Sequence, residues 1–385
     1  MQVVTVDGGV PIRVWATDAD EKTMAQAEHL AKLPFAAGPV ALMPDAHVGF
    51  GMPIGGVLAT RGVVIPNAVG VDIGCGVLAC KTGIEAAAVT TDDLKVLLAE
   101  IRKRVPVGFS HHAAGRSLET WEPAGAVTSR EMHKAKTQIG TLGGGNHFIE
   151  MQAGDNGQFY VMIHSGSRNV GKQVADHYND AAKLMNETWR SAVPREWDLA
   201  FLPLDSLDGL NYVAEMEACV AFAKLNRAAM LEAVLAGMES AWGNAGVLDT
   251  LDIAHNYAAM ESHGGTNVMV HRKGATRARE GEPGIIPGSQ GTASYLVRGK
   301  GNPLSYQSCS HGAGRQMGRK DAERRLDLAE EQRKLDAAGV LHAVRGKGDL
   351  DEAPGAYKPI EQVMAAQTDL VDIVVKLRPL AVVKG

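Results

Sequence analysis

Hydrophobic residues recur along the chain with two different periods, and each period predicts a different kind of element. Apolar positions spaced near every 3.6 residues indicate amphipathic helices, and short runs of β-branched and aromatic residues indicate strands. The helical pattern covers residues 18–33 with Asp18 or Thr17 as the cap, 92–105 after a Thr91 cap, 170–189, 210–242 and, as one highly charged helix, 319–336. Strands are predicted at 157–164, 267–273 and 293–299.

The predicted helices and strands alternate without a strict strand–helix–strand rhythm, so the fold class is mixed, α/β or α+β. No internal repeat, low-complexity tract or obvious linker interrupts the sequence. Its length permits two domains, but the informative motifs described below extend from residue 45 to residue 384. If these motifs build one site, residues 1–385 form a single interwoven domain.

Composition indicates the cellular setting. The start, MQVVTVDGG, lacks the basic residues and apolar run of a signal peptide, and no apolar stretch approaches the roughly 18 residues that span a bilayer. Four cysteines without regular spacing do not suggest a disulfide framework. We therefore expect a cytoplasmic protein that does not enter membranes, and a monomer.

Glycine and charge are both unevenly distributed. Glycine makes up 44 of 385 residues, and its clustering in five stretches indicates tight functional turns. The net charge is −5, yet residues 268–325 hold 11 Lys/Arg and 4 Asp/Glu, which gives +7 there and −12 elsewhere. A basic surface on an acidic body suggests a polyanionic ligand, although a solvated charged face has the same composition.

The stretch VGVDIGCG places Asp72 three residues before Cys75, with Gly74 and Gly76 beside the cysteine. A carboxylate and a thiolate at this spacing converge on one metal ion if the backbone turns tightly, and glycine permits such a turn. A thiolate can also bridge two ions. The alternative is a buried structural cysteine beside a surface aspartate.

Four histidines stand next to glycine or polar residues where strands or loops are expected to end: His147 in GTLGGGNHFIE, His164 in VMIHSGSR, His255 in DIAHNYA and His311 in SCSHGAGR. A lone histidine is usually an ordinary core or surface residue, but four together with Asp72 and Cys75 favour a metal centre. Asn146 and Asn256 are placed to orient two of these imidazoles or to bind substrate. The mixed donor set leaves Zn²⁺, Mn²⁺, Fe²⁺ and Co²⁺ open.

Nucleotide binding would require an unusual cradle, because neither a P-loop nor a dinucleotide fingerprint is present. The glycine loops at 285–295 and 310–315 expose backbone N–H groups that hold anions. HSGSRNVG runs from a strand into a helix start, where Arg168 would add a bidentate clamp on phosphate. His311 differs from the other histidines, since an imidazole beside bound phosphates serves either as a nucleophile on phosphorus or as a further metal ligand.

In combination, these motifs resemble those of RtcB-type RNA ligases. MPDAHVGFGMPIGGV, GVDIGCG, GTLGGGNHFIE, HSGSRNVG, AHNY, RKGATRAREGEPGIIPGSQGTASYLVRG, SCSHGAGR and the terminal LRPLAVVKG carry the resemblance, which spans about residues 33–385 and is weakest near 190–250. Phe50 departs from the pattern, because many relatives carry a polar or basic residue there.

The resemblance implies an RtcB-like fold with a central dinuclear metal pocket that uses two Mn²⁺ ions and GTP. Asp72, Cys75, His147, His164 and His255 would be the metal ligands, with the thiolate shared by both ions, and His311 would be the catalytic, guanylated histidine. The positions matching the family's guanylate contacts are Asn146, His147, Phe148, Ile149, Glu150, His255, Asn256, Pro287, Gly288, Ser289, Gln290, Ser294, His311, Gly312, Ala313, Gly314 and Lys384.

The implied activity joins an RNA end bearing a 3′-phosphate or 2′,3′-cyclic phosphate to a 5′-hydroxyl end, in RNA repair or tRNA splicing. A metal-dependent phosphoesterase acting on RNA ends without ligation and a non-enzymatic RNA-binding protein with a structural metal are the alternatives. The basic tract agrees with an RNA partner, and the low aromatic content of 5% favours end recognition over extensive base stacking. Our candidates for RNA phosphate contacts are Arg168, Arg272, Lys273, Arg277 and Arg279.

Overall fold

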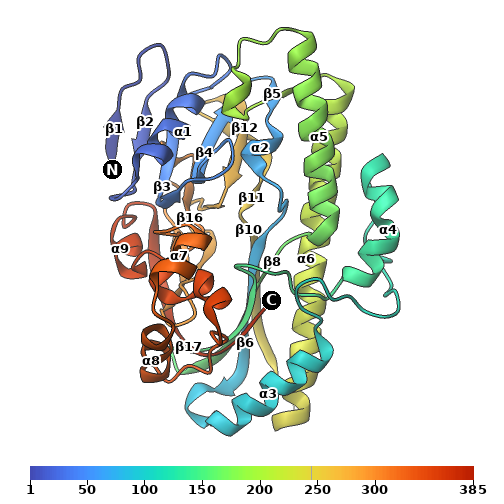
Figure 1. Cartoon of the computed structure of the whole chain (residues 1–385), viewed down its shortest axis with the longest axis vertical. Helices are drawn as coiled ribbons and strands as arrows, with labels where there is room; N and C mark the ends of the chain where they lie inside the picture. The colour runs from blue at the N-terminus through green and yellow to red at the C-terminus, as the bar shows by residue number, and fades with distance from the viewer. Residues whose placement is uncertain (244) are drawn as a thin grey trace.

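The computed structural model describes residues 1–243 and 245–385 and organises them around two β-sheets (Figure 1). The strands of the first sheet, in spatial order, are β1 (Gln2–Val4), β2 (Ile12–Val14), β3 (Val40–His47), β4 (Ile54–Thr60), β12 (Thr266–Lys273) and β11 (Asn256–His263). Only β2 and β3 run parallel within it. Early and late segments of the chain therefore pair side by side.

The second sheet is antiparallel throughout. Its strands, in spatial order, are β10 (Val247–Ala254), β6 (Gly76–Glu85), β8 (Gln158–Ser165), β7 (Phe148–Gly154), β17 (Val371–Lys384), β15 (Ser294–Gly299) and β14 (Pro283–Ile286). The outer strands β10 and β14 also contact each other, so the sheet curls into a nearly closed form. Two short pairings join β5 (Val63–Val64) to β9 (Leu202–Pro203) and β13 (Ala275–Arg277) to β16 (Ser308–Ser310).

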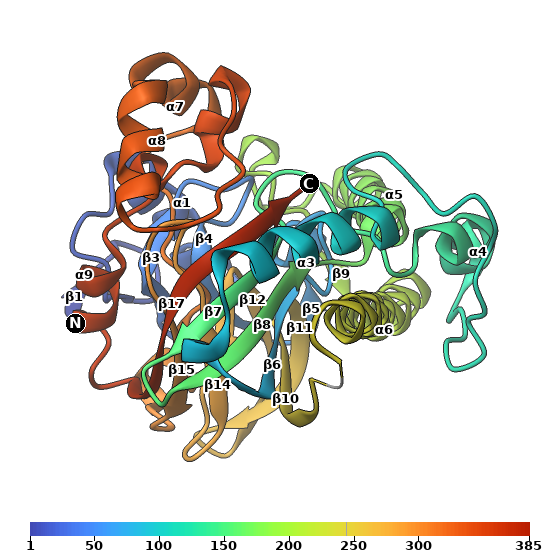
Figure 2. The same cartoon turned by 90° about the horizontal axis from the view of Figure 1, so that it is seen from below.

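Helices α3 and α6 cover one side of the second sheet, and α5 packs against α6 (Figure 2). The α-helices are α1 (Glu21–Ala31), α2 (Pro66–Val69), α3 (Thr91–Arg104), α4 (Ala126–Gln138), α5 (Arg168–Thr188), α6 (Leu207–Trp242), α7 (Arg319–Arg325), α8 (Leu328–Ala337) and α9 (Ile360–Ala365). Short 3₁₀ turns are η1 (Ala86–Ala88), η2 (Arg195–Trp197), η3 (Pro303–Ser305), η4 (Lys347–Glu352) and η5 (Pro354–Ala356). A buried cluster including Leu97, Val234 and Ile163 joins α3 and α6 to β8, and each such side chain contributes about 1.5–3 kcal/mol through burial.

The predicted strands are confirmed to within one residue, and most predicted helices agree except at their starts. Residues 18–33 form a helix only from Glu21, because the Asp20 carboxylate accepts a hydrogen bond from the Thr23 N–H (2.8 Å) and caps the helix there. The cap of α3 is Thr90, one residue before the predicted Thr91. Thr90 and Asp93 bond reciprocally in a capping box.

The prediction of one helix over 319–336 is wrong, because the segment forms α7 and α8. Leu326 adopts an extended conformation with ψ 143°, which ends α7. Asp327 then caps α8 by accepting a hydrogen bond from the Glu330 N–H (2.8 Å). The apolar spacing continues across the break, which is why the periodicity did not reveal it.

Two compositional expectations were examined on the structure. Cys75, Cys80, Cys219 and Cys309 are all free and buried, so the chain has no disulfide framework. No helix in the described part of the chain is both long and apolar enough to cross a membrane. The mixed α/β class is confirmed.

Candidate metal centre and nucleotide cavity

The topology of the second sheet brings four predicted metal ligands to one end of it. Cys75 directly precedes β6, His147 directly precedes β7, His164 lies one residue before the end of β8, and His255 directly follows β10. Because β6 is antiparallel to both β8 and β10, and β7 is antiparallel to β8, these four positions share one end of the sheet. The His255 N–H also donates to the Cys75 carbonyl oxygen (2.8 Å), which fixes their separation.

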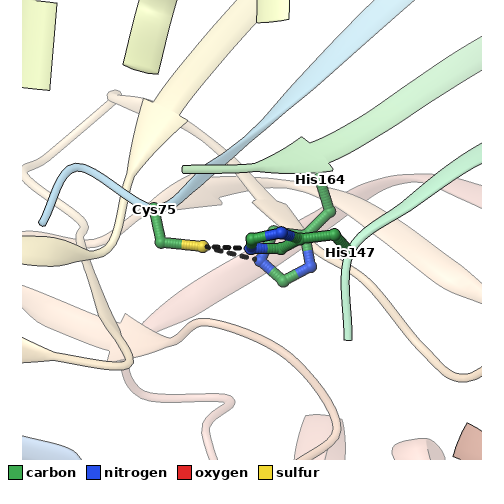
Figure 3. A group of neighbouring side chains, drawn as sticks. All are labelled: Cys75, His147 and His164. Atoms are coloured by element: carbon green, nitrogen blue, oxygen red, sulfur yellow. Dashed lines mark hydrogen bonds between the residues drawn. The ribbon is translucent and has the colours of Figure 1, made fainter. Parts of the chain in front are cut away.

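The donor atoms of these residues converge. The Sγ of Cys75 lies 3.3 Å from Nε2 of His147 and 3.2 Å from Nε2 of His164, and Figure 3 shows both imidazoles turned toward the sulfur. Nε2 of His255 lies 3.4 Å from Nε2 of His164. All four side chains are buried. The thiol of Cys75 and the imidazoles of His147 and His164 therefore form a group of potential metal ligands, and the His255 imidazole adjoins it through His164.

Asp72 joins this cluster through the tight turn that the sequence indicated. Its Oδ2 lies 2.9 Å from Nε2 of His147, and the Cys75 N–H donates to its carbonyl oxygen (3.1 Å). Gly74 sits at φ +74° in this turn, a conformation that glycine adopts without strain. A Cβ at Gly166 would lie 1.9 Å from the Asp72 carboxylate, so the glycine of HSGSR leaves room for it.

The protonation states of the cluster suit a bound cation. Nδ1 of His164 donates to the Asn146 carbonyl oxygen (3.1 Å), which leaves the Nε2 lone pair directed at the sulfur. Burial lowers the pKa of His164 and of His255 well below the ordinary value, and burial raises the pKa of the Cys75 thiol well above its own. These three groups are therefore neutral when no ion is present. A divalent ion would accept the lone pairs and displace the thiol proton, so the residues fit a metal.

His311 lies next to the cluster and is held by a residue to which the sequence assigned no role. Its Nδ1 lies 2.6 Å from Oδ2 of Asp45, a wholly buried carboxylate on β3 that also accepts the backbone N–H groups of His311 and Gly312. Burial alone would raise the pKa of Asp45, but the His311 imidazole holds it below its ordinary value. Nδ1–H therefore donates to Asp45, and Nε2 keeps its lone pair. The ring of His311 packs edge-on against His255, with centroids 4.7 Å apart.

A cavity of about 480 Å³ opens beside His311 and His164. Among the residues matched to guanylate contacts, those that line it are Asn146, Phe148, Glu150, Pro287, Gly288, Ser289, Gln290, His311, Gly312, Ala313, Gly314 and Lys384. The remaining members of that set do not line the cavity: His147, Ile149, His255, Asn256 and Ser294. A single concave site thus collects segments from both halves of the sequence.

The five residues outside the cavity wall have other places. His147 and His255 belong to the sulfur–imidazole cluster, and Ile149 points into the core between the sheet and α3. The amide of Asn256 donates to the Asp72 carbonyl oxygen (3.1 Å) and accepts from the Gly274 N–H (2.8 Å). Ser294 Oγ accepts from the Gly288 N–H (3.1 Å). Asn256 and Ser294 therefore brace the loops that carry ligand-facing groups.

A charged group in the cavity wall is centred on Glu352, a residue that sequence reasoning missed. The nearly buried carboxylate of Glu352 pairs with Lys384 (2.8 Å), with Arg319 (3.2 Å) and with Arg315, and it accepts a hydrogen bond from the Tyr357 hydroxyl (2.6 Å). We call these five side chains the Glu352 cluster. Glu352 in η4, Arg319 in α7 and Tyr357 were marked neither by periodicity nor by a dense glycine motif, whereas Arg315 ends the motif SCSHGAGR and Lys384 is a predicted guanylate contact. Arg319 also pairs with Asp351 (2.6 Å), so three cations face two carboxylates and this part of the wall is positively charged.

The predicted RNA phosphate contacts divide into exposed and buried residues. Arg279 is exposed, and Arg277 is paired with Glu282 (2.6 Å) at the surface. Arg168 is partly buried and donates to Thr141 Oγ1 (3.1 Å) and to the Gly108 carbonyl oxygen (2.6 Å).

The structure does not support RNA contacts at Arg272 and Lys273. Arg272 has no exposed surface, and its guanidinium pairs with Glu261 (2.6 Å). The ammonium of Lys273 is buried and donates to the carbonyl oxygens of Phe50 (2.6 Å) and Asn67 (3.0 Å). Neither side chain is presented to a phosphate, because β12 is buried continuously from Val268 to Lys273, on both of its faces.

Comparison with known proteins shows similarity over nearly the whole chain. The family model described as "tRNA-splicing ligase RtcB" matches residues 26–127 and 116–385. The RNA-splicing ligase RtcB of Escherichia coli K12 is 37% identical, covering 97% of each chain. The tRNA-splicing ligase RtcB of Nanoarchaeum equitans is 33% identical over 98% of this chain and 95% of its own, and the RNA-splicing ligase RtcB of Mycobacterium bovis is 34% identical over 94% and 100%.

Proposed function

The chain belongs to the RtcB family, and from that premise we propose that it is a GTP-dependent, manganese-dependent RNA ligase. It joins RNA ends bearing a 3′-phosphate or 2′,3′-cyclic phosphate to 5′-hydroxyl ends. One observation carries the proposal: Nδ1 of His311 is hydrogen-bonded to Asp45, so the lone pair of the neutral imidazole is on Nε2, in a residue that lines the cavity.

Asp72, Cys75, His147, His164 and His255 would hold two Mn²⁺ ions. When bound, the ions supply positive charge that polarises phosphate oxygens and activates water for opening a cyclic phosphate. The residues themselves contribute prealigned neutral donors, because their backbone positions are set by the ends of β6, β7, β8 and β10. Asn146 contributes indirectly, since its carbonyl oxygen fixes the tautomer of His164.

In the first step, His311 Nε2 attacks the α-phosphorus of GTP. The N–P bond forms as the bond from the α-phosphorus to the bridging oxygen breaks, and pyrophosphate leaves. The imidazole becomes cationic, and Asp45 stabilises that charge through Nδ1–H without taking the proton. Asp45 is therefore a positioning residue for the nucleophile.

In the second step, an oxygen of the RNA 3′-phosphate attacks the phosphorus of the bound GMP, and the N–P bond to His311 breaks. The 5′-hydroxyl of the other strand then attacks the activated 3′-phosphate, and GMP leaves. The Glu352 cluster offers cations to the departing phosphates, because Arg315 and Lys384 line the cavity that contains His311. A simple phosphoesterase would need neither the nucleophile nor this cluster.

The decisive experiment is transfer of label from α-labelled GTP to the protein in the presence of Mn²⁺. We expect an acid-labile label on the wild type and none on His311→Ala. Asp45→Asn should label at least about 100-fold more slowly, because the amide no longer selects the tautomer with a free Nε2. Equal labelling of His311→Ala and wild type, or phosphate release from RNA ends without any labelling, would overturn the proposal.

A further inference from the structure

Three apolar side chains are exposed where the loop after β3 meets the turn before Cys75. Val48 is 40% exposed, Phe50 is 56% exposed and Val71 is 57% exposed. We call these residues the apolar rim. Single exposed apolar residues are common and need no explanation, but Val48 of this group lines the cavity that contains His311, and Val71 adjoins Asp72 of the metal cluster. Val48 and Phe50 lie in the loop between β3 and β4, and Val71 lies between α2 and β6, which follow each other in Figure 1.

The loop that carries Phe50 is held firmly, although its side chains face outward. Both polar atoms of the Gln26 amide bond to the backbone of Gly49, at 2.8 and 3.1 Å. The ammonium of Lys273 links the Phe50 carbonyl oxygen to that of Asn67. Burial lowers the pKa of Lys273 to about 7. The sequence predicted that this amine contacts RNA, but in the structure it holds the loop in place. The backbone under Phe50 is thus fixed from two sides.

The rim is continuous with the site on both edges. Val48 lines the same cavity as His311, and Val71 directly precedes Asp72, whose carboxylate contacts His147. Any RNA end that brings its phosphate to this cluster must run its last nucleotide over or beside the rim. The flat, uncharged faces of nucleobases match an exposed phenyl ring accompanied by two valines. Because the backbone under this ring is already held in place, stacking costs little conformational entropy.

We propose that the apolar rim, with Phe50 at its centre, is a stacking surface for the terminal nucleobase of an RNA strand docked at the metal cluster. The inference rests on the proposed ligase function and deepens it, because it assigns a second recognition element besides phosphate contacts. Recognition through stacking tolerates every base, as end joining requires. The low aromatic content of the chain is consistent with this proposal, because it requires only one aromatic ring at the reacting end of the RNA.

The test compares ligation kinetics of the manganese-loaded full chain with those of Phe50→Ala and Phe50→Trp. Trp189→Ala is the matched control, since Trp189 is 52% exposed and lies at the far end of α5, about 30 Å along the helix from Arg168. Each protein is first scored for guanylation, which needs no RNA and reports a folded site. Phe50→Ala should raise KM for RNA about tenfold, the size expected for one lost base stack, while Phe50→Trp and Trp189→Ala stay near wild type.

A fluorescence arm separates stacking from a general structural effect. 2-Aminopurine is placed as the last base of the 3′-phosphate strand in one titration and as the first base of the 5′-hydroxyl strand in another. Quenching on wild type that is lost on Phe50→Ala, in either strand, supports the proposal and identifies the stacked end. Unchanged KM together with no quenching in either strand overturns it, as expected if the rim binds a protein partner. Failure of the wild type to guanylate would instead reject the ligase function.

Discussion

The two ends of the cavity differ in their electrostatics, because one offers electron-pair donors and the other offers cations. At one end, the thiol of Cys75 and the imidazoles of His164 and His255 are buried, neutral and directed at one another. At the other end, the Glu352 cluster gathers three cations on one carboxylate. The first end presents lone pairs and the Asp72 carboxylate, and the second presents cations in excess of anions. A nucleoside triphosphate with its metal ions would satisfy both.

The two ends also differ in how they are built. The sulfur–imidazole end is fixed by strand termini, so a few ångströms of backbone register determine where each donor lies. The Glu352 cluster uses long side chains from α7, η4 and the end of β17, which reach a common carboxylate from separate segments. Rigid donors suit a metal with strict geometry, whereas flexible cations suit phosphates that change position during a reaction.

The largest expected effect is loss of metal from Cys75→Ala. Because Sγ is the atom toward which the imidazoles of His147 and His164 turn, its removal should reduce bound manganese at least about tenfold and abolish guanylation. Metal content after gel filtration is the measurement. Cys80→Ala is the matched control, since Cys80 is also buried and free but belongs to the core behind the sheet. Unchanged manganese in Cys75→Ala would remove this sulfur from the site.

The next prediction concerns the opposite end. Glu352→Gln leaves Arg315 and Lys384, which are only 14% and 12% exposed, without their shared anion. The variant should lose about 2 kcal/mol of free energy of unfolding in urea, less than for a fully buried pair because some solvent reaches the cations. Pyrophosphate should restore part of that loss by supplying the missing negative charge.

Asp321→Asn provides the comparison for Glu352→Gln. It removes an exposed pair with Arg324 on the same helix segment and should change stability by less than about 0.5 kcal/mol. The expectation fails if Glu352→Gln changes the free energy of unfolding as little as Asp321→Asn does, or if pyrophosphate does not stabilise the variant. Either result would mean that loss of the shared anion does not destabilise the cations. The contrast between the two ends would then be geometric only.

The sequence anticipated the end of the site that is built from short motifs. VDIGCG, GGGNHF and HSGSR each place a donor and a permissive glycine within a few residues, so local spacing made Asp72, Cys75, His147 and His164 candidates, and the resemblance to RtcB-type ligases proposed them as ligands. Their convergence depends on sheet pairing, which spacing does not specify. The mixed fold class and most elements followed from periodicity, whereas the break at Leu326 did not, because both halves keep the same apolar spacing.

Asp45 and Glu352 show what single-sequence reasoning lacks. Asp45 stands in the quoted motif MPDAHVG, yet its partner His311 is 266 residues away, and only the pairing of distant segments reveals the contact. Glu352 sits in an unremarkable acidic stretch, and its role follows from three cations arriving from elsewhere. Conversely, Arg272 and Lys273 looked like surface cations in a basic tract, but both faces of β12 are covered at these positions and both side chains are buried.

The smallest expected effect concerns the titration of Glu150, which lies between the two ends of the cavity. This carboxyl is 3% exposed, and burial raises its pKa from 4.5 to about 8, even though the Gln152 amide donates to it (2.5 Å). Between pH 4.5 and pH 8, the native side chain is therefore protonated while the unfolded one is ionised. Unfolding releases a proton in this window, so the free energy of unfolding falls as pH rises and levels off above pH 8.

Urea titrations at pH 6.5 and 7.5 measure the effect, and Glu150→Gln isolates it from other titrating groups. The wild type should lose about 1 kcal/mol more than the variant over that interval. Guanylate binding should be affected as well, because a neutral acid at this position of the cavity wall donates a hydrogen bond where a carboxylate only accepts. An identical pH slope in both proteins would mean that Glu150 is ionised in the native state. The positive field of the Glu352 cluster would then extend through Lys384 as far as β7, and the division of the cavity into a lone-pair end and a cationic end would be wrong.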